Sequence, residues 1–255
     1  MTNDFSVPPD WYLTFFTAPV MRFWESAVPS AATDADVAFI VRHAGLLPSA
    51  EILDMPCGAG RHALGLARAG FHVTGFDHSE PALERAVAIA KAEGLRVRFA
   101  RADMLEFEVD RPADALICMG NSLGYFEPVM TAKVLRRFAA ALRVGGRLLI
   151  DTSICAESLL PLTTERSFSF PGGTYEQEMA YDPAESILKT RAHLTLDDER
   201  HELRYRHFVM TSGEFVRLVR AAGFELRGLF GDTQDAPFGP GSPRLLLVAE
   251  RRSAD

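Results

Sequence analysis

Two carboxylates flank a glycine-rich turn within one stretch of the chain, EILDMPCGAGRHALGLARAGFHVTGFDHS at residues 51–79. An apolar strand is expected to end on Asp54, and Gly58 and Gly60 then mark a tight turn whose backbone can approach a ligand. The free N–H groups at the start of the following helix suit an anionic group of that ligand. Asp77 ends a second strand, 19 residues after Gly58, where adenosine-binding α/β folds place the acid that binds ribose hydroxyls. The stretch therefore predicts an adenosine cofactor site.

Two cofactors fit this turn. Gly58, Gly60 and Ala63 match the dinucleotide fingerprint, whose last position tolerates alanine, so NAD is one of them. Asp54 favours the other, S-adenosylmethionine (SAM), because a carboxylate just before the glycines suits a ligand that carries an ammonium and a sulfonium group. SAM also lacks the pyrophosphate that this carboxylate would repel. The residues therefore favour SAM and leave NAD as the alternative.

The segment LDMPCGAGRHALGLARAGFHVTGFDHS resembles the first and second motifs of class I SAM-dependent methyltransferases, in the small-molecule branch whose turn reads D-x-x-C-G-x-G. The resemblance covers roughly residues 35–155 and 211–252. Further segments follow in the family's order: ARADMLEF at 100–107, ICMGNSLGYF at 117–126, LRVGGRLLID at 142–151 and SPRLLLVAERR at 242–252. The resemblance implies an α/β fold with a Rossmann-like seven-stranded sheet, in the order 3-2-1-4-5-7-6 with the last strand antiparallel.

The resemblance also implies which residues hold SAM. Asp103 would accept a hydrogen bond from the adenine amino group, Met104 would flank the ring, and Tyr12 would donate to the cofactor carboxylate. Asp103 is also explained as an ordinary turn residue after a strand, and Cys57 as a small buried residue. The expected cofactor-binding set is Tyr12, Asp54, Cys57, Gly58, Gly60, Arg61, Asp77, His78, Asp103, Met104, Met119 and Asn121.

Composition excludes some partners. The chain has 255 residues, of which 47% are hydrophobic and 24% charged, and this is typical of a globular protein with one large core. Its formal net charge is −7 and its Lys and Arg residues are scattered, so it offers no general attraction to a nucleic acid backbone. The segment GNSLGY at 120–125 also differs from the Asn/Asp-Pro-Pro-aromatic motif of the family's nucleic-acid amino methyltransferases. We expect no nucleic acid partner.

The location of the protein can also be predicted. No apolar run reaches membrane-spanning length, and residues 1–10 are neither basic nor followed by a signal-peptide core. Cys57, Cys118 and Cys155 form an odd set without metal-ligand spacing, which is typical of reduced thiols. We expect a cytoplasmic protein with no membrane partner and no metal, present as a monomer or a homodimer.

The core is expected to be discontinuous in sequence, with residues 33–155 and 211–255 forming one SAM-binding unit. Within it, a helix from Pro128 is predicted to end at a glycine cap, Gly145-Gly146, before the fifth strand. Thr211 and Glu214 form a capping box for a later helix. The fourth strand is followed by Asn121, which lies where open α/β sheets bind ligands and is expected to orient the substrate.

An aromatic N-terminal segment, residues 1–32, precedes the core. Residues 8–27 contain six aromatic residues, and the helical pattern of this stretch is expected to break at Pro19. Two interpretations remain open, a lid that closes over cofactor and substrate or a packed N-terminal helix.

The remaining residues, 156–210, are expected to form an antiparallel insertion that covers the substrate, with strands at 175–181, 187–196 and 203–210. Alternation places His207 on one face with Leu203, Tyr205 and Val209. A histidine among apolar neighbours is either a wall residue or a base. The weak catalytic candidates are Asn121, Tyr181 and His207.

Methyl transfer from a sulfonium is an in-line displacement that needs mainly positioning and desolvation of the two reactants. We expect a SAM-dependent methyltransferase that methylates an N or O atom of a small metabolite and releases S-adenosylhomocysteine. The alternatives are a non-catalytic SAM-binding protein and an NAD-dependent oxidoreductase. The missing second mononucleotide half after the fifth strand argues against the oxidoreductase. The acceptor itself does not follow from the sequence.

Overall fold

The glycine-rich stretch folds as a strand, a turn, a helix and a second strand. Strand β1 (Glu51–Asp54) leads into helix α4 (Arg61–Arg68), and β2 (His72–Asp77) then pairs parallel with β1. Ile52 and Leu53 are both buried but belong to different apolar clusters, because alternate side chains of a strand point to opposite faces of the sheet. This unit is therefore covered on both faces. The computed structural model describes residues 6–47 and 49–253.

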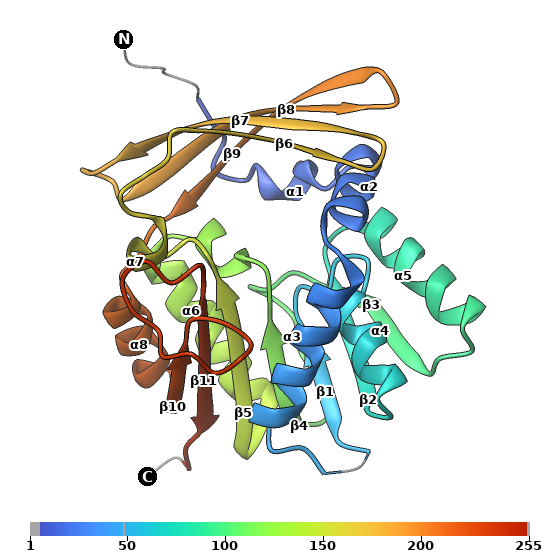
Figure 1. Cartoon of the computed structure of the whole chain (residues 1–255). Helices are drawn as coiled ribbons and strands as arrows, with labels where there is room; N and C mark the ends of the chain where they lie inside the picture. The colour runs from blue at the N-terminus through green and yellow to red at the C-terminus, as the bar shows by residue number, and fades with distance from the viewer. Residues whose placement is uncertain (1–5, 48, 254–255) are drawn as a thin grey trace.

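The unit lies inside a seven-stranded sheet in the order β10-β11-β5-β4-β1-β2-β3, and β11 is antiparallel to both of its neighbours (Figure 1). Counted along the core alone, this is the expected order 3-2-1-4-5-7-6, so the predicted fold class is confirmed. The remaining strands are β3 (Val97–Arg101), β4 (Ala113–Cys118), β5 (Leu142–Thr152), β10 (Phe224–Phe230) and β11 (Leu245–Arg251).

Helices cover this sheet. Phe39 and Ile40 pack in the same apolar cluster as Ile52, whereas Phe138 and Phe215 belong to the cluster of Leu53. Thr211 and Glu214 form both hydrogen bonds of the predicted capping box. The helical elements of the core are α3 (Ser30–His43), α5 (Glu80–Ala92), η1 (Ser122–Tyr125), α6 (Pro128–Ala141) and α8 (Ser212–Ala221).

The predicted glycine cap of α6 is wrong. The helix ends at Ala141, and β5 begins at once with Leu142 instead of after the glycines. Leu142 is fully buried and pairs with Ala113 of β4, so sheet pairing starts before Gly145 is reached. A Cβ on Gly146 would lie 3.2 Å from Asp114 O, which shows that this glycine serves close approach to β4.

A second, four-stranded antiparallel sheet lies over the carboxyl ends of the core strands, in the order β6-β7-β8-β9 (Figure 1). We call it the cover sheet. Three of its strands were expected, and the fourth, β6 (Glu165–Phe170), was missed because its residues are mostly exposed. The other elements of this insertion are α7 (Ala156–Leu159), β7 (Gly173–Asp182), β8 (Ile187–Leu196) and β9 (Glu199–Phe208).

The N-terminal segment lies between the cover sheet and the core as two helices, α1 (Tyr12–Phe15) and α2 (Ala18–Ala27) (Figure 1). The interruption falls at Phe16-Thr17, and Pro19 lies in the first turn of α2, where proline needs no hydrogen-bond partner for its nitrogen. Phe23 is buried and its ring stacks on Tyr175 of β7, with centroids 4.6 Å apart. The segment is therefore packed against the cover sheet. Its residues 1–5 lie outside the described residues.

No helix in the described ranges is long and apolar enough to cross a membrane. The division into residues 1–32, 33–155 with 211–255, and 156–210 stays our proposal for the domain organisation.

Candidate functional site

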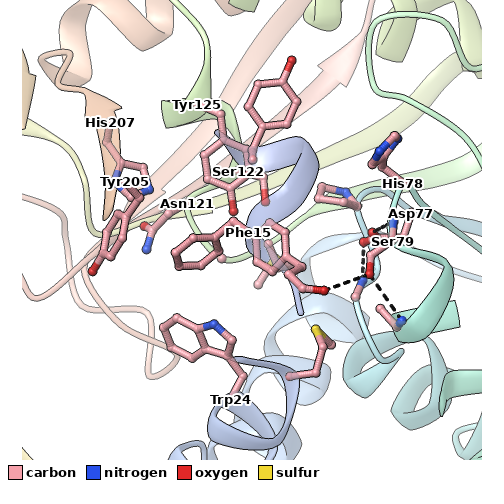
Figure 2. A pocket seen from close by; sticks show the side chains of 18 of the residues that line it. Phe15, Trp24, Asp77, His78, Ser79, Asn121, Ser122, Tyr125, Tyr205 and His207 are labelled. Atoms are coloured by element: carbon pink, nitrogen blue, oxygen red, sulfur yellow. Dashed lines mark hydrogen bonds between the residues drawn. The ribbon is translucent and has the colours of Figure 1, made fainter. Parts of the chain in front are cut away.

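A pocket of about 800 Å³ lies between the core and the cover sheet. Its walls come from four places: the turn at 55–61, the carboxyl ends of the core strands, the N-terminal helices and the underside of the cover sheet. Figure 2 shows Asp77 and Ser79 on one side of this space and Tyr205 and His207 on the other. The volume lies in the upper part of the range for ligand sites, so the pocket has room for a cofactor and a small second ligand.

The glycine turn keeps part of this pocket open. Gly58 has φ +54°, and a Cβ built on it would meet no atom within 4 Å. Gly120, which lines the pocket after β4, has φ +87° and likewise faces open space. Gly60 has φ +80°, and here glycine is needed for packing, since a Cβ built on it would lie 3.0 Å from Phe99 and 3.1 Å from Ala86. The backbone at Gly58 and Gly120 can therefore be approached closely by a ligand, as the SAM site requires.

Asp77 is held at the end of β2 by backbone donors. Its Oδ2 accepts a hydrogen bond from Gly58 N at 2.7 Å, and its Oδ1 accepts one from Ser79 N at 2.8 Å. Burial raises the pKa of this carboxyl, and the two backbone hydrogen bonds act in the opposite direction. A carboxylate oxygen can accept more than one hydrogen bond, so both oxygens keep capacity for ligand hydroxyls.

Asp103 and Tyr12 line the same pocket near one another. Asp103 Oδ1 accepts from Leu105 N at 2.7 Å, which is the local turn that an aspartate after a strand commonly makes. Tyr12 stacks on Tyr125 with ring centroids 5.8 Å apart. Burial and then the charge of Asp103 raise the pKa of Tyr12, so its hydroxyl stays protonated and can donate. Both expected interpretations of Asp103, a turn residue and a pocket residue, therefore hold for its geometry.

Ten of the twelve expected cofactor residues line the pocket: Tyr12, Cys57, Gly58, Arg61, Asp77, His78, Asp103, Met104, Met119 and Asn121. Gly60 and Asp54 do not. Asp54 is completely buried behind the turn, where its Oδ2 accepts from Ala63 N at 3.1 Å, and burial raises its pKa to about 8. Cys57 is buried as well, and burial raises the pKa of its thiol.

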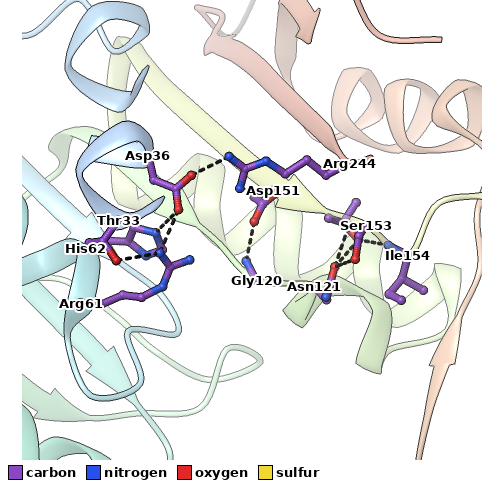
Figure 3. A network of polar contacts seen from close by, with 11 residues as sticks. Thr33, Asp36, Arg61, His62, Gly120, Asn121, Asp151, Ser153, Ile154 and Arg244 are labelled. Atoms are coloured by element: carbon purple, nitrogen blue, oxygen red, sulfur yellow. Dashed lines mark hydrogen bonds and ion pairs between the residues drawn. The ribbon is translucent and has the colours of Figure 1, made fainter. Parts of the chain in front are cut away.

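Asn121 begins η1 with φ +72° and lies at the carboxyl end of β4. Its Oδ1 accepts from Ser153 N at 2.6 Å and also from the hydroxyls of Thr152 and Ser153 (Figure 3). Because the oxygen is fully engaged, the amide NH₂ group is what remains for a ligand.

A buried ionic network, absent from the sequence predictions, lies behind Arg61. Asp36 of α3 accepts hydrogen bonds from Arg61 at 2.8 Å, from His62 at 3.1 Å and from Arg244 at 2.6 Å (Figure 3). Burial acts to raise the pKa of Asp36, but hydrogen bonds from His62 and Arg244 hold it well below its usual range. Asp36 therefore stays ionised and fixes one edge of the Arg61 guanidinium. In the sequence, Asp36 lies next to the apolar residues of a predicted helix, and nothing else near it indicates a role at the site.

The network continues to the loop that follows β4. Arg244 Nη1 lies 3.6 Å from Asp151 Oδ1, and Asp151 Oδ2 accepts from Gly120 N at 3.2 Å (Figure 3). The loop that carries Gly120 and Asn121 is therefore connected to α3 through two buried carboxylates.

The cover sheet contributes His207 and Tyr205 to the pocket, but Tyr181 does not line it. Tyr181 packs instead against the apolar cluster of Met179 and Val209. His207 is buried, and burial lowers its pKa to about 4, so it is uncharged at neutral pH. The hydroxyl of Tyr205 lies 2.8 Å from the hydroxyl of Tyr175. Of the three weak catalytic candidates, the structure brings Asn121 and His207 to the pocket.

Comparison with known proteins agrees with this geometry. Residues 52–146 match a protein family described as a methyltransferase domain. A putative methyltransferase of Geobacillus sp. (strain WCH70) is 24% identical over 242 residues, which cover 90% of this chain and 97% of the relative.

Two solved structures share the fold over almost the whole chain. The CcbJ methyltransferase from Streptomyces caelestis superposes with a TM-score of 0.83 at 17% identity, covering 94% of this chain and 99% of CcbJ. SAM-bound CalS10, an amino pentose methyltransferase from Micromonospora echinaspora involved in calicheamicin biosynthesis, gives a TM-score of 0.69 at 20% identity and covers 93% and 98%. The matched domain, the sheet order and the glycine turn with Asp77 make the chain similar to class I SAM-dependent methyltransferases, in its fold and in the turn expected to bind SAM.

Proposed function

We propose that the chain transfers the methyl group of SAM to a nitrogen or oxygen atom of a small metabolite. One observation carries the proposal: the pocket that contains Gly58 and Asp77 continues without interruption to Tyr205 and His207 under the cover sheet. A cofactor on the turn and an acceptor under the cover sheet would therefore meet in one pocket. Such positioning is what an in-line displacement needs most.

The proposed cofactor contacts follow the geometry. Asp77 would accept hydrogen bonds from the ribose hydroxyls, and Asp103 and Met104 would hold the adenine. Arg61 and Tyr12 would donate to the carboxylate of SAM. When bound, SAM supplies a methyl group on a positively charged sulfur.

The small size of the acceptor is supported by the cover sheet and by CalS10, whose described substrate is an amino pentose. The net charge of −7 gives a nucleic acid nothing to bind, so we propose no nucleic acid partner. A monomer or homodimer in the cytoplasm remains our prediction.

The test begins with calorimetry of the purified protein with SAM, S-adenosylhomocysteine and NAD. We expect SAM and S-adenosylhomocysteine to bind, NAD not to bind, and Asp77→Ala to weaken SAM binding at least about tenfold, because hydrogen bonds to a charged group contribute about 1.5–3 kcal/mol each. Unchanged affinity in Asp77→Ala would show that the cofactor lies elsewhere.

The acceptor is then sought by incubating a metabolite extract with methyl-labelled SAM and analysing it by mass spectrometry. One labelled product supports the enzyme. SAM binding without any labelled product favours the alternative of a non-catalytic SAM-binding protein, and binding of NAD in place of SAM favours the oxidoreductase.

A further inference from the structure

Three buried polar atoms of pocket-lining residues have no hydrogen-bond partner within the described residues: Trp11 Nε1, Ser158 Oγ and His207 Nδ1. The rings of Trp11 and His207 lie next to each other. Trp11 is 5% exposed and His207 is 6% exposed, and both residues line the pocket. Their ring centroids lie 5.8 Å apart, with the ring planes at 70°. Leaving such groups unpaired costs roughly 1–3 kcal/mol each, so they are expected to find partners in a ligand.

Trp11 Nε1 and His207 Nδ1 differ in what they can bind. An indole N–H only donates, whereas a neutral imidazole has one nitrogen that accepts. Together they suit a ligand with a hydrogen-bond donor next to an acceptor. A carboxylate has no proton to give His207.

The surroundings of the pair are aromatic. The rings of Tyr125 and Tyr205 lie 4.9 and 5.7 Å from that of Trp11, and each lies 5.6 Å from that of His207. The carboxylates that line the pocket come from α2, the end of β2, the start of α5 and the loop after β3: Glu25, Asp77, Glu80 and Asp103. Asp77 lies across the pocket from His207 (Figure 2). Glu25 is already paired with Arg85. An ammonium group at His207 would therefore have no counter-charge beside it.

We propose that Trp11 and His207 form the acceptor subsite, in which His207 Nδ1 accepts a hydrogen bond from an uncharged amine and Trp11 Nε1 donates to an oxygen atom next to that amine. This inference rests on the proposed function and narrows its substrate to neutral amines that carry a neighbouring hydroxyl or ether oxygen. An alcohol is a poorer acceptor here, because it must lose its proton as it is methylated and the buried imidazole is too weak a base to take it.

The nitrogen uses its lone pair for the bond to the methyl carbon, and the electron pair of the breaking C–S bond returns to the sulfur. The nitrogen becomes positively charged and its N–H more acidic, so the hydrogen bond to His207 is stronger in the transition state than in the ground state. The nitrogen keeps its own protons during the transfer, and the methylated ammonium product loses one of them to solvent after release. His207 therefore orients and stabilises without being protonated.

The titratable groups that face His207 are Tyr125 of η1 and Tyr205 of β9, and burial raises the pKa of both phenols. Neither becomes charged near neutral pH. The rate should therefore rise with pH as the substrate amine loses its proton, and it should level off above the pKa of that amine. A rate that falls as the amine deprotonates would overturn the proposal.

The test uses methyl-labelled SAM with trans-2-aminocyclohexanol as the probe, and with cyclohexylamine and 1,2-cyclohexanediol as matched compounds that lack the oxygen or the nitrogen. We expect aminocyclohexanol to be methylated best. His207→Leu should lower its kcat/KM at least about tenfold, and His207→Asn, whose amide oxygen can accept in place of Nδ1, should recover most of the loss.

Trp11→Phe keeps the ring and removes only the N–H. It should lower kcat/KM for aminocyclohexanol more strongly than that for cyclohexylamine. An equal effect on both probes, or preferred methylation of the diol, would overturn the proposal, as would a wild-type enzyme that methylates no probe although it binds SAM. Calorimetry with S-adenosylhomocysteine separates the proposed acceptor subsite from the proposed methyltransferase function. If every variant still binds S-adenosylhomocysteine, a failed activity test contradicts only the acceptor subsite. If the wild-type protein does not bind S-adenosylhomocysteine, the proposed function itself is contradicted.

Discussion

Arg244 Nη2 lies 2.6 Å from Asp36 Oδ1 and connects two residues that are 208 positions apart in the chain. Asp36 is on α3, at the start of the core, and Arg244 immediately precedes β11, at its end. Because Arg244 also faces Asp151 at 3.6 Å, one guanidinium compensates two buried carboxylates. The two ends of the core are thereby fixed to each other beside the loop of Gly120 and Asn121.

Replacing Arg244 is the first prediction. Arg244→Met leaves Asp36 and Asp151 without their shared cation, and we expect the free energy of unfolding to fall by about 3 kcal/mol, the lower end for a broken buried pair. Urea denaturation measures it. Arg42, an exposed residue on the same helix that pairs with Asp235, is the matched control, and Arg42→Met should cost at most about 1 kcal/mol. Equal losses in the two variants would contradict the role given to the buried network.

The second prediction compares the two glycines of the turn. Both have positive φ, so alanine at either position adds strain of about 1–2 kcal/mol. Gly60→Ala also pushes a methyl group against Phe99 and Ala86, whereas Gly58→Ala meets no atom. Thermal unfolding should therefore show a lower Tm for Gly60→Ala than for Gly58→Ala. Calorimetry should show weakened SAM binding in Gly58→Ala, and a Gly58→Ala protein that is the less stable of the two would refute this assignment.

The third prediction concerns the stability of the folded protein at low pH. Burial lowers the pKa of His207 from 6.5 to about 4, so below pH 6.5 the unfolded chain binds a proton that the folded chain does not. The stability that this histidine contributes is complete above pH 6.5 and is lost as the pH falls towards 4. His62 has the same shift and the same sign. These two histidines therefore act to decrease the free energy of unfolding, measured by urea denaturation, between pH 6.5 and 4, whereas Asp54, with its pKa raised to about 8, acts to increase it over the same range.

The variant His207→Asn should flatten this decrease because it removes one of the two shifted groups. His72, whose side chain is 60% exposed, provides the control, and His72→Gln should leave the slope as it is. The same pH slope in the wild-type protein and in His207→Asn would contradict the shift assigned to His207.

The fourth prediction tests how the N-terminal helices are held. Phe23 is 1% exposed and stacks on Tyr175, whereas its neighbour Trp24 is 46% exposed. Phe23→Ala should cost about 3–5 kcal/mol through the cavity it leaves, and Trp24→Ala should change stability by no more than about 0.5 kcal/mol. Thermal and urea unfolding measure both. Equal stability of the two variants would favour a loosely attached lid over the packed arrangement.

Much of the core could be predicted because its signals are local. The turn at Gly58, the acid that ends β2 and the capping box of Thr211 and Glu214 each lie within a short segment, and backbone geometry dictates their residue types. The sheet order followed from the resemblance carried by these segments, and the structure confirms it. His207 was also placed correctly, because strand alternation fixes which side chains share a face.

The parts that escaped prediction depend on contacts between distant segments. The partners of Asp36 come from α4 and from the residue before β11, and nothing near Asp36 in the sequence indicates them. Most residues of β6 are exposed, and its only apolar alternation is the short Phe168 and Phe170 pair, which packs on Phe23 of α2 and gives a weak signal in the sequence. Asp54 was expected among the cofactor-binding residues and does not line the pocket, because whether a strand's last side chain reaches a pocket depends on the path of the turn that follows it.

The chain leaves the core for the cover sheet and returns to the core at the same place. Cys155, which follows β5, forms an isolated parallel bridge with Met210, and Ala156 N donates to Met210 O at 3.0 Å. Because the entry and exit of the insertion touch, its length and sequence can change without altering the path of the core chain. Evolution or a protein engineer can thus exchange residues 156–210 as one piece and give a new acceptor to the same methyl-donor site.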